Sequence, residues 1–589
     1  MLRAHRVLVI SLAAACSARA AGPSGGQPPV PAPSVSVDSL LSSLSLREKI
    51  GQLVVPWLVG SYTAFDDSAY LVAARWVDTL AVGGIIISTG SPYDIAAKLN
   101  ALQTRSRLPL LISADLEYGA AMRVSGATAF PQIMAAGATG QAADAYTIGS
   151  AAAIEGRAVG IHVNFAPDAD LNNNPLNPII NTRSFGEDPR AVSALVQAYV
   201  RGVRDHGMLS TLKHFPGHGD TQTDSHLGLP TITADYRRLD TLELVPFRAG
   251  IAAGADVVMS AHIAYPTFTG TDDPATLSAA MLTGVLRDSL HFKGLVVTDA
   301  LTMGAIVTKY GIGEAAVRAF VAGSDLLLMP ADPDSAINAM VSAVVAGRVS
   351  GARLDESVRR VLEIKRRLGL FQRRTVALDS IPRVVGAKRL KDQADDIAVR
   401  ALTLVRDTTG TLRGLRGIRA RLALIAFGDE LNGAVGQHVA DLLRAGGDTV
   451  DYFRLWPMSG PASYDSARVV IAKHSRVAFV TSVRPISWRG NIAMPDSLGA
   501  LITTTDSLKP TILVSLGSPY LLNQTTAKTF LIAWSGANTA ERAVARALLG
   551  LSPIGGHLPI RIPPGYPVGW GLVMPDSTVP APSIAAPAR

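Results

Sequence analysis

The sequence has a single cysteine and few charged residues. With only Cys16 present, no disulfide can form within the chain. Charged residues make up 17% of the 589 residues and hydrophobic residues 48%, a balance that excludes global disorder and supports large cores in two or three domains. No run of Lys and Arg is interleaved with aromatic residues, so we expect no nucleic-acid partner.

The N-terminus lacks an apolar run long enough for a permanent membrane helix. Two Arg lie within residues 1–6, residues 7–15 are apolar, and small residues follow. This pattern predicts a signal peptide over residues 1–20, cleaved after Ala20. Alternatively, Cys16 is lipidated and becomes the N-terminus of a lipoprotein. Both alternatives predict a secreted protein, periplasmic or at the outer surface.

Two further segments have the composition of unstructured chain. Residues 21–36 are rich in Pro, Gly and Ser, and we expect a disordered tether there. Residues 575–589 are rich in Pro and Ala, and we expect a disordered tail. The formal net charge of +8 falls to about +5 without residues 1–20, which is mild for this size and identifies no charged partner.

Eight short apolar runs recur within residues 37–375, and amphipathic stretches such as 189–206, 236–253 and 279–290 lie between them. Most runs are rich in Val, Ile and Leu without alternation, as in strands buried on both faces. Eight strand–helix units predict a (β/α)8 TIM barrel, an α/β fold. The predicted strands are 52–59, 83–88, 108–114, 160–166, 208–212, 256–261, 294–298 and 325–329.

A second alternation of strands and helices follows a predicted linker over residues 376–391. It predicts a doubly wound α/β sandwich domain over residues 392–574. Its segment of the chain holds no dense cluster of ionisable residues, so the sequence assigns it no role. The predicted strands are 422–427, 477–481, 511–516 and 530–534, and the clearest helix is 540–549.

Polar residues gather at the carboxyl ends of the predicted barrel strands, where this class of barrel builds its active sites. Six of them lie outside the loop after the fifth strand. They are Asp115 and Glu117 after the third strand, Asp168 and Asp170 after the fourth, His262 at the end of the sixth, and Asp299 after the seventh.

The densest group of ionisable residues is the segment 213–226, Lys-His-Phe-Pro-Gly-His-Gly-Asp-Thr-Gln-Thr-Asp-Ser-His. It predicts a loop that holds chemistry at the end of the fifth strand. A metal site built from its His and Asp residues is the alternative. However, His214 and His218 share a face only in a helix, which Pro216 forbids. We therefore expect no metal, and expect His218 and Asp220 to shape the loop.

Two carboxylates and one imidazole are the candidates for the reaction itself. Asp299 directly follows an apolar strand, so it is either the N-cap of the next helix or a nucleophile facing the barrel mouth. Asp224 can bond one nitrogen of His226 and fix its tautomer, which leaves the other nitrogen to transfer protons. If His226 is not the proton donor, Glu117 is the next candidate.

Several of these segments together resemble family 3 glycoside hydrolases, in the branch of bacterial β-N-acetylglucosaminidases. The resemblance covers about residues 40–370. In one segment Tyr118 and Ala120 stand where the family commonly has glycine. The matching segments are 213–226, Thr-Asp-Ala-Leu-Thr-Met-Gly at 298–304, Asp-Leu-Glu-Tyr-Gly-Ala-Ala-Met-Arg at 115–123, Asn-Phe-Ala-Pro-Asp at 164–168 and Asn-Thr-Arg-Ser-Phe-Gly-Glu-Asp-Pro at 181–189.

The resemblance implies a retaining hydrolase, a monomer without cofactor, that removes terminal β-linked N-acetylglucosamine from glycans or cell-wall (muropeptide) fragments. It implies that Asp299 is the nucleophile and that His226, supported by Asp224, is the acid/base. The residues that it assigns to substrate binding are Asp115, Arg123, Arg183, Lys213 and His214. We also expect Lys213 to pair with a neighbouring Asp, and Asp168 and Asp170 to organise the Asn-rich loop.

Other functions fit the same barrel. A β-glucosidase, or a phosphorylase that uses phosphate in place of water, would share the fold and the residues. A saccharide-binding surface protein without activity belongs to another class. The presence of Asp299, Asp224 and His226 argues against it.

Overall fold

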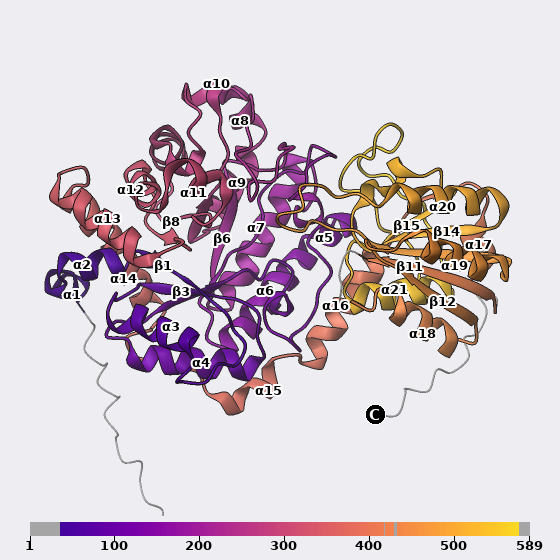
Figure 1. Cartoon of the computed structure of the whole chain (residues 1–589), viewed down its shortest axis with the longest axis horizontal. Helices are drawn as coiled ribbons and strands as arrows, with labels where there is room; N and C mark the ends of the chain where they lie inside the picture. The colour runs from indigo at the N-terminus through magenta and orange to yellow at the C-terminus, as the bar shows by residue number, and fades with distance from the viewer. Residues whose placement is uncertain (1–35, 417–418, 429–432, 577–589) are drawn as a thin grey trace, which may run out of the picture. The chain divides into compact units, whose positions relative to one another are not determined.

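The computed structural model describes residues 36–416, 419–428 and 433–576 (Figure 1). The predicted signal peptide, Cys16, all but the last residue of the tether and all but the first two residues of the tail lie outside the described residues. Among the residues that are described, none belongs to a helix long and apolar enough to cross a membrane. By its internal contacts, the chain from Val37 onward is one compact unit.

Eight parallel strands complete a ring in the first part of this unit. Strands β2 to β8 form one continuous sheet, and β1 pairs with β9. A bridge from Val297 to Leu326 joins β8 to the β9 segment. Only Pro56, which has no N–H to donate, separates β1 from β2, so these two short strands act as one.

With β1 and β2 counted as one, each of the eight predicted runs overlaps one strand of the ring, which confirms the predicted (β/α)8 class. The strands are β1 (Val54–Val55), β2 (Trp57–Leu58), β3 (Gly84–Ile87), β4 (Leu111–Ala114), β5 (Val163–Asn164), β6 (Leu209–Phe215), β7 (Val257–Ser260), β8 (Leu295–Thr298) and β9 (Leu327–Leu328).

The helices around the ring are amphipathic. In α7, for example, the Asp188 carboxylate caps the N-terminus by accepting from the N–H groups of Arg190 and Ala191, and Pro189 occupies the first turn. The helices are α1 (Val37–Ser43), α2 (Leu46–Gly51), α3 (Ser68–Asp78), α4 (Pro92–Arg105), α5 (Met134–Thr139), α6 (Ala142–Ala158), α7 (Pro189–Asp205), α8 (Tyr236–Thr241), α9 (Leu244–Ala252), α10 (Pro266–Thr269), α11 (Gly304–Tyr310), α12 (Ile312–Ala322), α13 (Pro333–Val345) and α14 (Gly351–Arg367), with shorter turns η1 (Ala120–Met122), η2 (Asn181–Arg183) and η3 (Ala275–Leu277).

Three elements differ from their predicted form. The predicted helix 236–253 is two helices, α8 and α9, and the predicted helix 279–290 is a π-helix, η4 (Ala280–Ser289). Strand β6 continues past residue 212 to Phe215, because the chain after β5 pairs with it. There Asp168 and Lys213 form a bridge, and the N–H of Ala169 donates to the Lys213 carbonyl. Lys213 and His214 therefore lie within the strand.

The second part of the unit is built on a six-stranded sheet in the order β10-β15-β14-β13-β11-β12, parallel except for β10. Helices α16, α18 and α21 bury side chains against one face, and α19 and α20 against the other, which confirms the predicted doubly wound domain. The elements are α15 (Ile381–Val384), α16 (Lys388–Ala401), β10 (Thr403–Asp407), α17 (Thr411–Leu415), β11 (Arg421–Gly428), α18 (Gln437–Ala445), β12 (Thr449–Leu455), α19 (Pro461–Ala472), β13 (Arg476–Ser482), α20 (Asp496–Leu508), β14 (Thr511–Ser515), β15 (Thr529–Ile532) and α21 (Asn538–Leu548), with η5 (Leu378–Ser380) and η6 (Pro519–Gln524).

Residues of this second sheet domain contact the loop between β5 and α7. The Tyr520 hydroxyl accepts from the Asn172 amide at 2.8 Å, and Arg561 pairs with Glu187 at 2.9 Å. The segment predicted as a linker, 376–391, contains η5, α15 and the first turn of α16.

Candidate active site

A cavity of about 520 Å³ lies at the carboxyl ends of the barrel strands. The structure brings seven of the eight predicted site residues into its lining. The eighth, Asp224, is buried behind His226. The seven that line the cavity are Asp115, Arg123, Arg183, Lys213, His214, His226 and Asp299.

Lys213 and Arg123 hold Asp115 at the cavity wall. The Lys213 ammonium lies 3.1 Å from one carboxylate oxygen of Asp115, and the Arg123 guanidinium lies 2.9 Å from the other. Burial raises the pKa of Asp115, but the two cations outweigh burial, and its pKa lies below the usual value. Asp115 is thus an ionised acceptor in a fixed position, as a clamp for two sugar hydroxyls requires.

Glu117 is the shared partner of Arg183 and Lys213. Arg183 donates to both of its oxygens, at 3.1 and 2.8 Å, and the Lys213 ammonium lies 2.8 Å away. Burial opposes ionisation of Glu117, but Arg183 and Lys213 hold its pKa far below the usual range. A carboxylate held ionised in this way is a poor proton donor, so the geometry disfavours Glu117 as the alternative acid.

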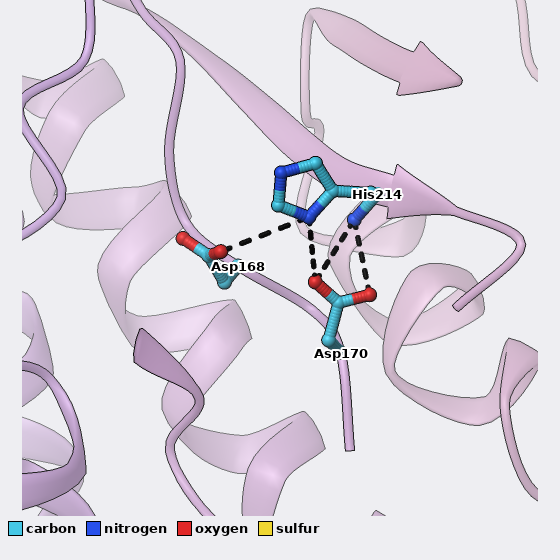
Figure 2. A group of neighbouring side chains, drawn as sticks. All are labelled: Asp168, Asp170 and His214. Carbon is cyan, nitrogen blue, oxygen red and sulfur yellow. Dashed lines mark hydrogen bonds and ion pairs between the residues drawn. The ribbon is translucent and has the colours of Figure 1, made fainter. Parts of the chain in front are cut away.

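Asp170 orients His214, which lies near the end of β6 (Figure 2). Its carboxylate lies 2.7 Å from Nδ1 of His214 and also accepts from the backbone N–H groups of His214 and His218, at 3.1 and 2.6 Å. With Nδ1 engaged, Nε2 of His214 is the nitrogen left for other contacts. Asp170 therefore fixes the course of the chain from 214 to 218 as well as the imidazole.

Asp168 lies beside this pair and is fully buried. One of its oxygens is 3.8 Å from Nδ1 of His214 and 3.2 Å from the guanidinium of Arg183. Burial and the neighbouring charge of Glu117 outweigh these cations and raise the pKa of Asp168 to about 7.

Asp168, Asp170 and His214 are the one group of possible metal ligands found among the described residues. Asp170 already accepts from three N–H groups, and Arg183 supplies a positive charge next to Asp168. A metal ion would have to displace these partners, so the group has the character of an ion-pair network.

The His and Asp residues of the segment 213–226, which were the alternative metal ligands, do not come together as one site. Each has its own partners. His218 lies within hydrogen-bond distance of Thr221 and Ser225, at 2.9 and 3.0 Å. Asp220 pairs with Arg238 at 2.6 Å. His218 and Asp220 thus hold the loop through local contacts.

Asp224 and His226 form a bonded pair at the cavity rim. The Nδ1 atom of His226 is 2.7 Å from Oδ1 of Asp224, which also accepts the backbone N–H of His226 at 2.9 Å. The chain turns here, because the N–H groups of Leu227 and Gly228 both donate to the Asp224 carbonyl. The Asp224 side chain is 0% exposed and that of His226 is 22% exposed. The imidazole can therefore present Nε2 to the cavity while Asp224 fixes its tautomer.

Asp299 directly follows β8 and is half-buried. The next helix, α11, begins only at Gly304 with Met303 as its N-cap, so Asp299 does not cap it. Burial raises the pKa of Asp299, but His214 and two further imidazoles outweigh burial and lower it to about 2. Asp299 is thus an ionised carboxylate that faces the same cavity as His226.

The segment of the chain that forms the barrel matches a known protein family. The model of the glycosyl hydrolase family 3 N-terminal domain matches residues 45–364. The chain belongs to this family.

Relatives and solved structures extend the likeness over the second domain. The chain is 30% identical to a β-N-acetylglucosaminidase/β-glucosidase of Cellulomonas fimi, over 89% of this chain and 95% of the relative. It is 37% identical to β-hexosaminidase A of Pseudoalteromonas piscicida, over 49% of this chain and 54% of that protein.

Two solved structures share the whole architecture. A family 3 β-N-acetylglucosaminidase from Paenibacillus sp. str. FPU-7 superposes with a TM-score of 0.80 at 33% identity, covering 88% of this chain and 99% of that one. A β-glucoside phosphorylase superposes with a TM-score of 0.81 at 27% identity, covering 89% and 95%.

Sequence reasoning missed the part of this family 3 site that comes from the second domain. Residues Arg484, Pro485, Ile486, Ser487 and Trp488 also line the cavity. They follow β13 at its carboxyl end, and an Arg and a Trp just past a predicted strand are the signal that could have drawn attention to them.

We predict that catalysis needs no divalent metal, because the candidate ligands are already engaged with one another and with Arg183. Overnight dialysis against EDTA should leave kcat/KM on an activated β-N-acetylglucosaminide unchanged. A mock dialysis without chelator is the control. Activity that falls in EDTA and returns with zinc would contradict the prediction.

Proposed function

We propose that the protein is a retaining glycosidase that removes terminal, non-reducing β-linked N-acetylglucosamine. The observation that carries this proposal is the placement of Asp299 and His226 on one cavity, with Asp299 ionised and with Asp224 bonded to Nδ1 of His226. The relatives named β-N-acetylglucosaminidase and β-hexosaminidase support the choice of sugar.

In the first step an oxygen of Asp299 attacks C1 of the sugar, and the bond from C1 to the leaving oxygen breaks. The leaving oxygen takes a proton from Nε2 of His226, and the electron pair of the broken bond stays on that oxygen. The product is a glycosyl ester of Asp299. Asp224 stabilises the imidazolium before transfer and holds the tautomer afterwards.

In the second step Nε2 of His226 accepts a proton from water, whose oxygen attacks C1 as the bond to Asp299 breaks. Two inversions at C1 give net retention of configuration. Because the nucleophile is a carboxylate of the protein, the acetamido group of the substrate need not take part.

The polar residues on the barrel side are suited to hold the sugar. Asp115 offers a fixed carboxylate to hydroxyl groups, with Arg123 and Lys213 as donors beside it. Arg183 and His214 also line the cavity and offer further polar contacts to the sugar.

Phosphorolysis is the second candidate, favoured by the likeness to a solved β-glucoside phosphorylase. A neutral imidazole does not repel an anion as a second carboxylate would, so phosphate could replace water in the second step.

We further propose that the protein is an exported monomer, free or anchored through a lipid on Cys16, that acts on cell-wall fragments or other glycans.

Product analysis tests the proposed reaction. We predict that a β-N-acetylglucosaminide releases the β-anomer of N-acetylglucosamine first, seen by proton NMR before mutarotation, and that added phosphate does not change the product. A β-glucoside, which lacks the acetamido group, should react more slowly. Initial formation of the α-anomer would overturn the retaining mechanism. A sugar phosphate among the products would show that the reaction is phosphorolysis and not hydrolysis.

The His226→Ala variant tests the acid/base role. It should lower kcat/KM by about 10²- to 10⁴-fold for substrates with poor leaving groups, and far less for activated phenyl glycosides, which depart without a proton. The second step should be slow for both, and azide should accelerate it because azide needs no base.

The matched control is His206→Ala, because His206 lies at the C-terminal end of α7 and outside the cavity lining. His206→Ala should leave kcat/KM unchanged for both substrate types. Equal slowing of both substrate types by His226→Ala in the first step would show that His226 positions the substrate and is not the acid.

A further inference from the structure

A segment of the second domain contacts the acid/base pair directly. The backbone N–H of Trp488 donates to Oδ2 of Asp224 at 2.8 Å, while Oδ1 is engaged by His226. The indole of Trp488 packs edge-on against the imidazole of His226, with ring centroids 5.2 Å apart and planes at 62°. One residue of the second domain therefore touches both members of the pair.

The conformation of Trp488 is unusual for a tryptophan. Its φ is +75°, in the left-handed region that residues other than glycine seldom occupy, and its side chain remains 57% exposed. A large exposed ring adds little to the core of its own domain, and strained backbone tends to persist where function requires it. The contacts of Trp488 with Asp224 and His226 are a reason for it to be held there.

The residues just after Trp488 also approach the acid/base segment. At Gly490, where φ is +72°, an added Cβ would lie 3.1 Å from the side chain of Leu227. The segment 488–490 thus approaches the segment 224–227 at both Trp488 and Gly490, and the contact is not confined to one hydrogen bond.

The acid/base segment is also held by the barrel. The N–H of Gly304 donates to the carbonyl of His226 at 3.3 Å, and the N–H of Ala305 donates to that of Ser225 at 3.4 Å. These donors lie in the first turn of α11, the helix that follows the strand before Asp299. The segment 224–227 therefore contacts both α11 of the barrel and Trp488 of the second domain.

We propose that Trp488 is a positioning residue for the acid/base pair, and that the second domain completes the catalytic site in this way. Its N–H occupies the second oxygen of Asp224, so that Oδ1 stays with Nδ1 of His226. Its ring limits rotation of the imidazole and keeps Nε2 directed to the leaving oxygen. This inference rests on the proposed function, because it assigns Trp488 a role in the proton transfer made by His226.

The experiment uses the full-length protein with Trp488→Gly, which keeps the N–H, tolerates the positive φ and removes the ring. The Trp488→Phe variant keeps an aromatic ring. The control is Trp456→Gly, an exposed tryptophan of the same domain outside the cavity lining. The two substrates are methyl β-N-acetylglucosaminide, whose leaving group is small and poor, and the 2,4-dinitrophenyl glycoside, which departs without a proton.

Trp488→Gly should lower kcat/KM, which reports the first step, on the methyl glycoside by about 10- to 100-fold, because misplaced proton donors lose rate steeply. The kcat/KM on the dinitrophenyl glycoside should fall by less than about 3-fold, because the departure of dinitrophenolate needs no acid. Trp488→Phe should restore most of the loss on the methyl glycoside, and Trp456→Gly should resemble the parent on both. The melting temperature of each variant is recorded alongside.

An equal loss of kcat/KM on both substrates in Trp488→Gly, or no loss on either, would overturn the positioning role. A loss confined to the dinitrophenyl glycoside would also overturn it and make Trp488 a contact for aromatic leaving groups. If the parent protein cleaves neither glycoside, the proposed function itself fails. An active parent that is insensitive to Trp488→Gly refutes only this inference.

Discussion

The geometry of the site depends on one shared carboxylate, Glu117, to which Lys213 and Arg183 are both bound. All three charges are buried or nearly so, and buried charges are tolerated only when each is paired. Loss of one partner from such a pair commonly costs about 3–5 kcal/mol. Because Lys213 also binds Asp115, and Arg183 also lies beside Asp168, the position of Glu117 is linked to the positions of both aspartates.

The same residue type has opposite properties at two places in this site. Asp299 lies among imidazoles, and its pKa falls to about 2 although burial favours the neutral acid. Asp168 lies deeper, beside the charge of Glu117, and its pKa rises to about 7. The proposed proton-transfer role falls on neither of them but on His226, whose side chain is 22% exposed. Environment, not residue type, separates the proposed nucleophile from the other carboxylates.

Much of the fold follows from local sequence pattern. The eight barrel strands are apolar runs buried on both faces, and the polar residues at their carboxyl ends mark the cavity because parallel strands end on the same side. Strands β10 and β12 escaped prediction because they lie at the edges of the second sheet, where polar residues interrupt the pattern. The extension of β6 depends on a bridge to Asp168, which no pattern within β6 records.

The part that could not be predicted is the contact between segments far apart in the chain. Trp488 and Asp224 are 264 residues apart and meet through a backbone N–H, which every residue except proline has. The sequence favoured a nucleophile at Asp299 but left an N-cap open as the alternative, and the start of α11 at Gly304 argues against that alternative. Local periodicity gives the elements, whereas the assembly of the site depends on tertiary contacts.

The central claim is that Asp299 forms the bond to the sugar. A fluorinated N-acetylglucosaminide that reacts quickly in the first step and slowly in the second should trap the intermediate for peptide mass spectrometry. We expect a single labelled peptide with the sugar on Asp299, and a loss of roughly 10³-fold or more in turnover for Asp299→Ala. A label on another residue, or full turnover in Asp299→Ala, would contradict it.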